Sequence, residues 1–398
     1  MATYEYESLK EKYSSFMKPS IVIRVNDKEL TDKKKGFPVG EVEVELTSGY
    51  EASVAEFSIF NVYDLIQNEF LYDEVSKYIF LGSKIEIEMG YRDITTLVFI
   101  GVITRVNFFY ETEGIPCIRV TAMDVKGVMM SGSYDLQLKA TNYADAVKEI
   151  LKRTAYEKLR NSGIIQNITV DDTPDKRNSM GQENDEASDK TIEMVAESDY
   201  EFVVKIGKRN NFEFFTECGN VIFRKAKSDT KILMEISPTM PLRNFDISYD
   251  ITGIVEKVVV RGMDVSKAKV IKAEKKFSNS ISQGNKAKAV IKGSQKVYID
   301  STLSSKEEAE TRVESLMENM SYRYGTLRCE LIGIPELQPG HFIRMSGLGT
   351  GPDNKFYLNK VKHVYDDEGR YHVELEGIGD SAGNEDVFGD IGSISSLF

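Results

Sequence analysis

The sequence has no tryptophan, and only three cysteines and three histidines occur among its 398 residues. Cys117, Cys218 and Cys329 lie far apart and form no CxxC pair, which argues against a structural zinc site and against a disulfide framework. We therefore expect assembly in a reducing cytoplasm. No apolar run reaches the length of a transmembrane helix, and the first residues contain no apolar signal-peptide core. We expect no membrane insertion by this chain.

The motifs of common enzyme classes are also missing. The chain has no HExxH, no GxSxG, no P-loop and no GxGxxG after a predicted strand. His341, His363 and His372 lack metal-ligand spacing, so we interpret them as partly buried or interface side chains. Asp124 and Asp380 end two similar strands and are expected to form turns. We predict no catalytic residue, no cofactor-binding residue, no metal ligand, no cofactor and no enzymatic activity.

Positive charge is in deficit, because the formal net charge is −12 at pH 7. Such a chain repels nucleic acid and anionic membranes, which disfavours a general role in DNA binding. Glu41, Glu43 and Glu45 share one face of a predicted strand and are expected to face solvent or a channel. The Lys-rich segment 267–296 is the one basic island. It is interpreted as a solvated loop, a contact with an acidic neighbouring protein or a nucleic-acid contact.

What the chain does contain is strand-like alternation. At 41% hydrophobic residues it can bury real cores, and its length allows two or three domains. Alternating segments separated by turn residues every 8 to 12 positions predict antiparallel barrels or sandwiches. The predicted strands fall into an early and a late series: 21–23, 41–46, 52–60, 85–89, 97–106 and 117–123, then 251–261, 325–332, 342–345, 357–364 and 371–376.

The middle of the chain reads differently. Residues 142–159 have a helical apolar stripe that Asn142 can cap, and residues 171–190 lack periodicity and are expected to form a surface loop. Residues 198–224 predict a helix capped by Ser198, ended by Asn210–Asn211 and followed by an aromatic hairpin. A further helix is predicted over 304–322.

The two strand series resemble each other. Residues 81–124 and 337–380 have the same length and similar order, with Met89 matching Met345 and Phe99 matching Phe356. This predicts a duplicated β-barrel. Three copies of a chain with two similar barrels would present six similar units in a ring.

The segment Glu197-Ser198-Asp199, with its basic helix end and aromatic hairpin, resembles the core signature of phage tail hub proteins. These are the late control D family and the hub portion of VgrG spike proteins. Residues 333–340, GIPELQPG, resemble that family's G-x-P-x-L-x-P-G turn, and residues 258–264 resemble its strand followed by Gly-Trp-Asp, with Met263 in place of Trp.

The resemblance implies a structural baseplate hub. It implies a homotrimer that adapts a trimeric spike to the hexameric tail tube of a contractile tail or phage-tail-like injection particle. Other baseplate proteins would be partners, and DNA or other cargo would pass through the lumen, whose wall we expect to be acidic. VgrG proteins continue into an OB-fold and a β-helical needle that this chain lacks, so a separate spike chain is expected.

We expect an α+β, mainly β fold with two similar small antiparallel β-barrels and an intervening α/β region. The predicted domains are 1–135 (N-terminal arm and first barrel), 136–245 (helix, loop and capped helix–hairpin insert), 246–385 (second barrel with one long helix) and 386–398 (flexible tail). The protein would be assembled in the bacterial cytoplasm and released in a virion tail or an extracellular particle.

Two alternatives stay open. One is a tail-tip peptidoglycan hydrolase, which would need a catalytic cleft that spacing alone does not reveal. The other is a receptor-binding or glycan-binding tail module, for which the Tyr-rich loops are suitable. The sequence does not distinguish a phage from a phage-tail-like bacteriocin (tailocin) or a secretion device, and it does not identify the spike and tube partners.

Overall fold

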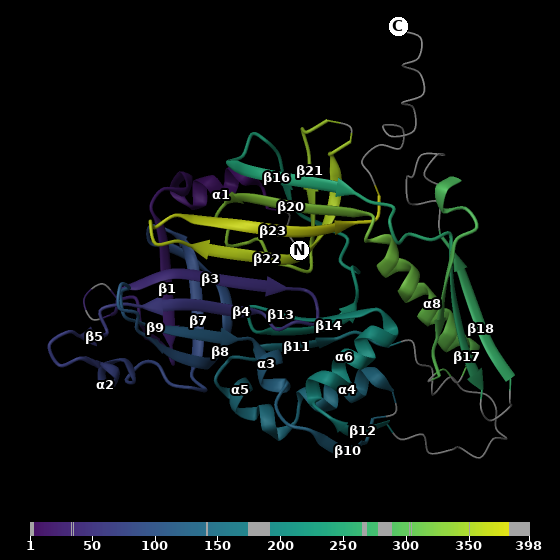
Figure 1. Cartoon of the computed structure of the whole chain (residues 1–398), viewed down its shortest axis with the longest axis horizontal. Helices are drawn as coiled ribbons and strands as arrows, with labels where there is room; N and C mark the ends of the chain where they lie inside the picture. The colour runs from purple at the N-terminus through teal and green to yellow at the C-terminus, as the bar shows by residue number, and fades with distance from the viewer. Residues whose placement is uncertain are drawn as a thin grey trace, which may run out of the picture.

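The computed structural model describes residues 4–32, 34, 36–140, 142–173, 192–264, 269–277, 289–301, 303, 305–349 and 351–381. Figure 1 shows two β units one above the other, an α/β insert below them and a separate helix-and-sheet arm at one end. The predicted mainly β, antiparallel architecture is confirmed. No helix of the described residues is long and apolar enough to cross a membrane.

The first β unit uses the early strand series. Its strands follow the order β2-β1-β7-β8-β9-β4-β3, and every pairing is antiparallel. In Figure 1, β1 and β7 run across β3, β4 and β9, and the long strand β8 belongs to both layers. The bounds are β1 (Pro19–Val25), β2 (Lys28–Glu29), β3 (Val39–Thr47), β4 (Val54–Ile59), β7 (Lys84–Tyr91), β8 (Ile94–Phe109) and β9 (Cys117–Met123).

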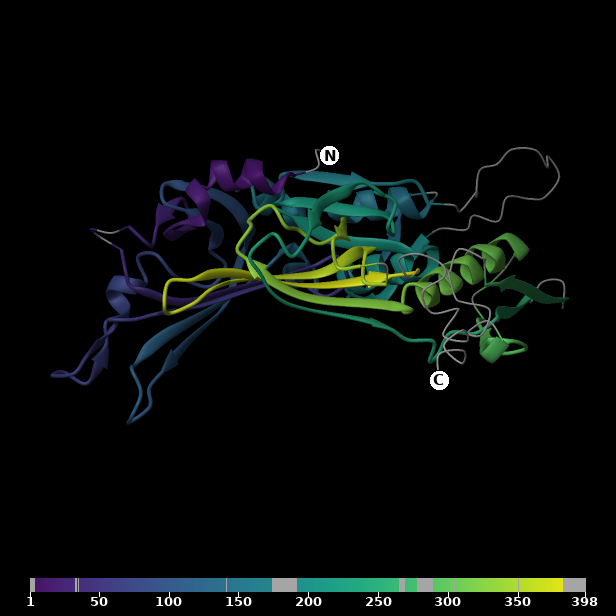
Figure 2. The ribbon, with the colours of Figure 1, turned by 90° about the horizontal axis from the view of Figure 1, so that it is seen from above.

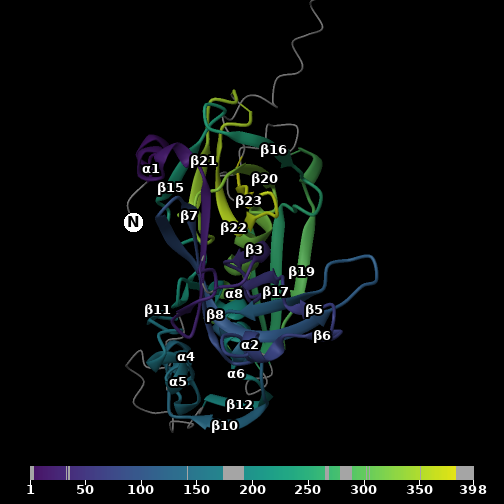
Figure 3. The same ribbon diagram turned by 90° about the vertical axis from the view of Figure 1, so that its left-hand side faces the viewer.

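Two short additions decorate this unit. A small hairpin, β5 (Tyr63–Asp64) and β6 (Glu69–Phe70), precedes α2 (Tyr72–Val75). Figure 3 shows this hairpin projecting from the sheet beside the turn that joins β8 to β9. At the N-terminus, α1 (Tyr6–Lys12) and the 3-10 turn η1 (Ser14–Phe16) bury Leu9, Tyr13 and Phe16 in the common core. The described part of the predicted N-terminal arm therefore packs on its own chain.

The second β unit repeats the order of the first. Its strands run β15-β21-β22-β23-β20-β16, which matches β1-β7-β8-β9-β4-β3 strand for strand. One difference is that β15 pairs parallel to β21, whereas β1 pairs antiparallel to β7. The bounds are β15 (Ile232–Ile236), β16 (Leu242–Tyr249), β20 (Gly325–Ile332), β21 (Phe342–Met345), β22 (Asn354–Tyr365) and β23 (Tyr371–Gly379). The duplicated arrangement predicted from residues 81–124 and 337–380 is thus present.

The two units are joined through their edges into one sheet of 13 strands. β3 pairs antiparallel with β22 from Val42 opposite Tyr365 to Thr47 opposite Lys360. We call this pairing the seam. Residues of both units also share one hydrophobic core, which lies on one side of the sheet. Figure 2 shows α1 and the insert on that side, while the other side of β16, β20 and β23 is uncovered.

The insert contains the predicted capped helix and hairpin. Ser198 accepts a hydrogen bond from the Glu201 N–H and the Glu201 side chain returns to Ser198, so the helix α6 begins with a complete capping box. Asn211 ends it at φ 57°. The bounds are α3 (Val125–Met129), β10 (Tyr134–Leu138), α4 (Tyr143–Leu151), the 3-10 turn η2 (Thr154–Tyr156), α5 (Glu157–Asn161), β11 (Asn167–Val170), β12 (Ile192–Glu197), α6 (Asp199–Asn210), β13 (Phe212–Glu217) and β14 (Asn220–Lys225).

In the sequence, the arm is inserted between β16 and β20 of the second unit. A three-stranded sheet in the order β18-β17-β19 packs against the long helix α8, which Ser305 caps. The bounds are β17 (Lys257–Asp264), β18 (Lys269–Lys276), β19 (Gln295–Ile299) and α8 (Lys306–Ser321). The corresponding place in the first unit is the short connection from β3 to β4.

Some local predictions were wrong. The helix predicted over 142–159 ends at Leu151 and is followed by η2 and α5, and the strand predicted from residue 251 begins at Lys257. The interpretation of the basic island as a loop fails for β18 and β19, whose exposed lysines lie on strands. Most of the predicted loop 171–190 and the tail 386–398 lie outside the described residues. The bounds of the four predicted domains stay a prediction.

Candidate functional site

The side of the shared sheet that faces away from the core is polar and continuous across both units. Its side chains alternate with buried apolar ones on eight adjacent strands, from β16 to β8. Seven are acidic and five are basic: Asp246, Glu330, Glu374, Glu376, Glu43, Glu45 and Glu56, with Arg328, Lys360, Lys362, Arg105 and Arg119. We call this surface the polar face. It carries a mixed charge with a small acidic excess.

Ion pairs on the polar face cross the seam. Lys362 Nζ lies 2.5 Å from Glu43 Oε1, and Lys360 Nζ lies 2.8 Å from Glu45 Oε1. Glu41 is exposed at the start of the same strand. These contacts confirm that Glu43 and Glu45 share a strand face, and they add cationic partners that the sequence pattern did not reveal. Beside them, a hollow of about 410 Å³ is lined by Glu41, Glu43, Glu56, Arg105 and Arg119, among others.

Equivalent positions in the two units can be matched through their irregularities. β22 shifts register against β23 between Leu358 and Lys360, and β8 shifts against β9 between Ile103 and Arg105. Matching these bulges makes Lys360 equivalent to Arg105 and His363 equivalent to Phe108. Following the pairings across each unit then makes Glu43 of β3 equivalent to Asp246 of β16.

Among the strand edges that lack a partner strand in the described chain are those of β16 and of the end of β8. β16 pairs only with β20, and β8 beyond Ile103 pairs only with β9. Both edges carry exposed apolar side chains on the core side: Phe245 is 42% exposed and Phe108 44% exposed. Ladder hydrogen-bonding groups and large apolar side chains together make each edge suited to pairing with another strand.

A buried charge cluster attaches the insert to the first unit. Lys126 is fully buried, and its ammonium donates to the carbonyls of Gly49, Glu51 and Phe214 and lies 3.7 Å from Asp124 Oδ2. Burial lowers the pKa of Lys126, and Asp124 opposes that shift. Asp124 also caps α3 and accepts from Thr216 Oγ1 at 2.7 Å. The interpretation of Asp124 as a turn former is correct for α3, but sequence spacing did not reveal its buried lysine.

A second cluster attaches the insert to the second unit. Arg224 Nε donates to Glu213 Oε1 at 2.6 Å, and the Tyr357 hydroxyl donates to the other oxygen of Glu213. Burial raises the pKa of Tyr357 well above its ordinary value, so it stays protonated as a donor. Arg224 also donates to the carbonyl of Gly340. Gly340 has φ +89°, and a Cβ there would lie 2.7 Å from Phe215, so the predicted glycine turn requires glycine.

The three histidines have separate environments. His363 is fully buried, with Nδ1 2.8 Å from the Tyr371 hydroxyl and Nε2 3.0 Å from the carbonyl of Leu337, and burial lowers its pKa to about 4. His341 is buried between Glu217 and Asp229, at 3.6 and 3.5 Å. Val364 and Val373 oppose His372 and His363, which places the two histidines on opposite faces. No group of three metal-ligating side chains forms among the described residues.

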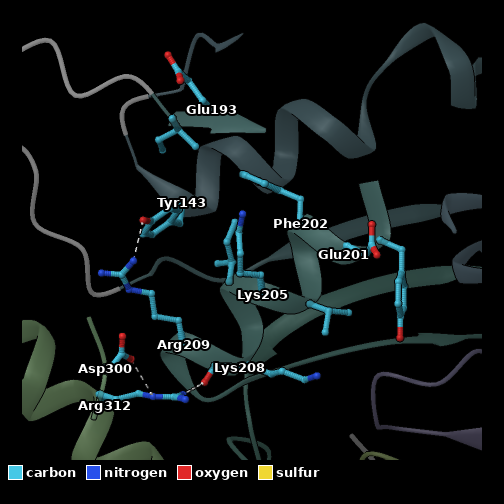
Figure 4. Close-up of a pocket in the computed structure, with 13 residues that line it drawn as sticks. Tyr143, Glu193, Glu201, Phe202, Lys205, Lys208, Arg209, Asp300 and Arg312 are labelled. Carbon is cyan, nitrogen blue, oxygen red and sulfur yellow. Dashed lines mark hydrogen bonds and ion pairs between the residues drawn. The ribbon is translucent and has the colours of Figure 1, made fainter. Parts of the chain in front are cut away.

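The insert also borders a groove of about 760 Å³ next to the arm. Figure 4 shows Lys205, Lys208, Arg209 and Arg312 around it, with Tyr143 and Phe202. Its cations are engaged: Arg209 Nη2 lies 3.0 Å from Glu308, Arg312 Nε lies 3.7 Å from Asp300, and Lys205 Nζ lies 2.5 Å from Glu197. Glu201 belongs to the capping box. The Arg209–Glu308 pair, and Arg312, which donates to the carbonyl of Lys208, connect α6 to the arm, and the described lining residues include no histidine, cysteine or serine.

The three cysteines are free thiols. Cys117, Cys218 and Cys329 form no disulfide, and burial raises the pKa of Cys218 and of Cys329 to about 12. Thiols with such pKa values stay protonated near neutral pH.

A family model described as the Alg8 N-terminal domain matches residues 60–367. The chain belongs to this family. The description names a domain and states no reaction. A search of curated proteins finds no match.

Solved structures identify the fold of the chain as that of phage tail proteins. A tail protein from Neisseria meningitidis MC58 is 13% identical, with a TM-score of 0.62 over 91% of this chain and 97% of that one. The 43 kDa tail protein of prophage MuSo2 from Shewanella oneidensis is also 13% identical, with a TM-score of 0.63 over 91% and 98%. The resemblance to the baseplate hub fold is therefore confirmed.

A third structure extends the comparison to secretion systems. The E. coli c3393 protein is 9% identical, with a TM-score of 0.51 over 89% of this chain and 76% of that one. It is described as a component of the type VI secretion system with structural similarity to the T4 tail proteins gp27 and gp5. These likenesses concern the fold of the chain.

Proposed function

We propose that this protein is the structural hub of a contractile tail or phage-tail-like injection particle. Three copies form a ring that adapts a trimeric spike to the hexameric tail tube. The chain is not an enzyme in this proposal: the fold is that of tail proteins. Its partners are a spike on a separate chain, the tube protein and other baseplate proteins, and the particle is assembled in the bacterial cytoplasm and then released.

One observation carries this proposal: the two strand edges that pair at the seam have equivalents elsewhere in the described chain whose edges are unpaired. Within the chain, β3 of the first unit pairs with β22 of the second. The equivalents of these strands are β16 and β8, and both have uncovered edges. Suppose that β16 of one chain pairs with β8 of the next in the way that β3 pairs with β22. Every junction between neighbouring units, within a chain or between chains, then has the same geometry. Three chains then form a ring of six units.

The seam predicts the register of this junction between chains. Val42, Val44 and Glu45 lie opposite Tyr365, His363 and Lys362. The equivalent pairs are Phe245 opposite Tyr110, Ile247 opposite Phe108, and Ser248 opposite Asn107. The first two pairs join apolar side chains on the core side, of which Phe245, Tyr110 and Phe108 are exposed and Ile247 is partly buried, and the third joins polar side chains on the polar face. Both sides of the sheet therefore match across this junction.

A ring of this kind turns the polar face toward the lumen in our proposal. Carboxylates there repel phosphate and reduce adhesion of passing DNA. The small acidic excess of the polar face favours this arrangement, although five cations interrupt it. A surface potential computed on an experimentally determined ring tests the point, and a basic wall would contradict it.

The oligomeric mass tests the proposed function. Light scattering on the purified protein at several concentrations should give three times the 45.0 kDa of one chain. A single-chain mass at every concentration would contradict the trimer. Hydrolysis of peptidoglycan in a zymogram would support the hydrolase in place of the hub.

A further inference from the structure

The sheet of the arm has one face that no element of the described chain covers. Val258, Val260, Ile271 and Ala273 pack against α8 in the core of the arm. On the other side of the sheet, β17, β18 and β19 carry Met263, Val270, Val297 and Ile299, all exposed. Ile299 is 86% exposed. We call this surface the outer face of the arm.

The outer face is also cationic. Lys257, Arg261, Lys272 and Lys276 share it with a single carboxylate, Glu274. Glu274 already has two cationic neighbours, with Lys272 Nζ at 2.8 Å and Lys257 Nζ at 3.5 Å. The whole chain has a net charge of −12. A local excess of three positive charges around aliphatic side chains suits an acidic segment that also has apolar residues.

The chain contains one segment of this chemistry that begins near the arm. Residues 382–398 include three acidic residues and no lysine or arginine, together with Val387, Phe388, Ile391, Ile394, Leu397 and Phe398. They follow Ser381, whose carbonyl accepts a hydrogen bond from Asn354. Burial is the main cause that raises the pKa of Tyr322, the residue that ends α8, and the nearby charge of the Asp380 carboxylate raises it further. The segment therefore starts at the C-terminal end of α8.

The length of the segment is sufficient. A 17-residue chain spans up to about 56 Å when extended, whereas the 16 residues of α8 rise by about 24 Å. We propose that residues 382–398, from the same chain or from a neighbouring copy, dock on the outer face of the arm. Their carboxylates pair with its lysines and Arg261, and their aliphatic and aromatic side chains cover Met263, Val270 and Ile299. This inference does not depend on the proposed ring.

Photocrosslinking in the full chain tests the docking. An Ile299→p-benzoylphenylalanine variant should crosslink on illumination to peptides from residues 382–398, identified by mass spectrometry. The matched control is Ile66→p-benzoylphenylalanine on the β5–β6 hairpin, because Ile66 is 92% exposed and this hairpin lies at the opposite end of the molecule from the arm in Figure 1. The control should not crosslink to that segment.

Charge reversal sharpens the test. In the Ile299→p-benzoylphenylalanine protein, the added changes Arg261→Glu and Lys272→Glu should lower the yield of this crosslink about tenfold. Lys139→Glu with Lys158→Glu, on the insert, should leave the yield unchanged. Crosslinks from position 299 to any other segment or to another protein would overturn the proposal. An absent crosslink, or a yield insensitive to the outer-face charges, would do the same.

Discussion

His363 and Phe108 hold equivalent positions in the two β units but have opposite environments. His363 is 0% exposed, because β3 covers its strand edge, whereas Phe108 is 44% exposed on an uncovered edge. The partner positions differ in the same way: Val42 is buried and its equivalent Phe245 is exposed. Within the chain, β3 and β22 pair to form the seam. Their equivalents, β16 and β8, have edges without a partner strand in the described chain. In the proposed ring, these two edges pair with each other between neighbouring chains.

The largest effect should come from a charge placed in the seam. Val42→Asp leaves an unpaired carboxylate in the common core and should lower the free energy of unfolding by about 4 kcal/mol or more. The equivalent change at the uncovered edge, Phe245→Asp, should cost about 1 kcal/mol or less in the isolated chain. Urea denaturation under conditions that dissociate the oligomer measures both.

The variant with the smaller effect on unfolding, Phe245→Asp, should have the larger effect on the oligomeric state. Phe245→Asp should reduce the oligomer to single chains in light scattering, because it places a carboxylate in the proposed apolar contact with Tyr110 of the next chain. If the Phe245→Asp protein keeps its oligomeric mass, the edge of β16 does not form the contact between chains. Equal destabilisation by both variants would erase the distinction between seam and edge.

The pH dependence of stability should come second. The pKa of His363 is lowered to about 4 in the folded protein, against about 6.5 in an unfolded chain. The unfolded state therefore binds more protons between these values, and stability falls as the pH drops from about 6.5 to about 4. The loss amounts to about 3 kcal/mol.

A His363→Gln variant isolates this contribution. Urea denaturation across that pH range should show a weaker dependence for the variant than for the parent, whatever their difference at neutral pH. Profiles with the same slope would mean that His363 is not the buried group responsible. Phe108→Gln at the equivalent edge position should leave the parent's slope intact.

The smallest effect should come from the ion pairs on the polar face. The side chains of Glu43 and Lys362 are 37% and 26% exposed, so solvent screens their attraction. Glu43→Gln should therefore lower the free energy of unfolding by about 0.2–1 kcal/mol, and less in 0.5 M salt. A loss above about 2 kcal/mol would mean that solvent does not screen these ion pairs.

Local features could be predicted from the sequence because they depend on neighbouring residues. Ser198 predicted the start of α6, Asn210–Asn211 predicted its end, and strands β20 and β21 were predicted to the residue. The basic island misled because Lys272 and Lys276 of β18 project from the outer face of a strand, while Ile271 and Ala273 face α8. A solvated strand face and a solvated loop have the same composition.

The candidate site depends on long-range pairing, which the pattern did not contain. The matched lengths of residues 81–124 and 337–380 predicted two similar units, but nothing in them indicated that Val42 pairs with Tyr365. Alternation fixes which side chains share a face and leaves the partner strand open. The same holds for Lys126, whose buried contacts come from Gly49, Glu51 and Phe214 on separate elements.

Disulfide trapping tests the unfinished junction most directly. Asn107→Cys with Ser248→Cys should form a disulfide between chains on mild oxidation, because directly opposite strand positions bring Cβ atoms within about 5.5 Å. As a matched control, Glu45→Cys with Lys362→Cys, directly opposite across the seam, should crosslink within one chain.

Moving one cysteine by one residue, in Asn107→Cys with Ile247→Cys, places the two thiols on opposite faces of the sheet and should abolish the link. The account predicts dimer and trimer bands on a non-reducing gel for the first pair only. If the seam pair forms its disulfide while the 107–248 pair stays monomeric, or links no better than the shifted pair, the proposed junction is wrong.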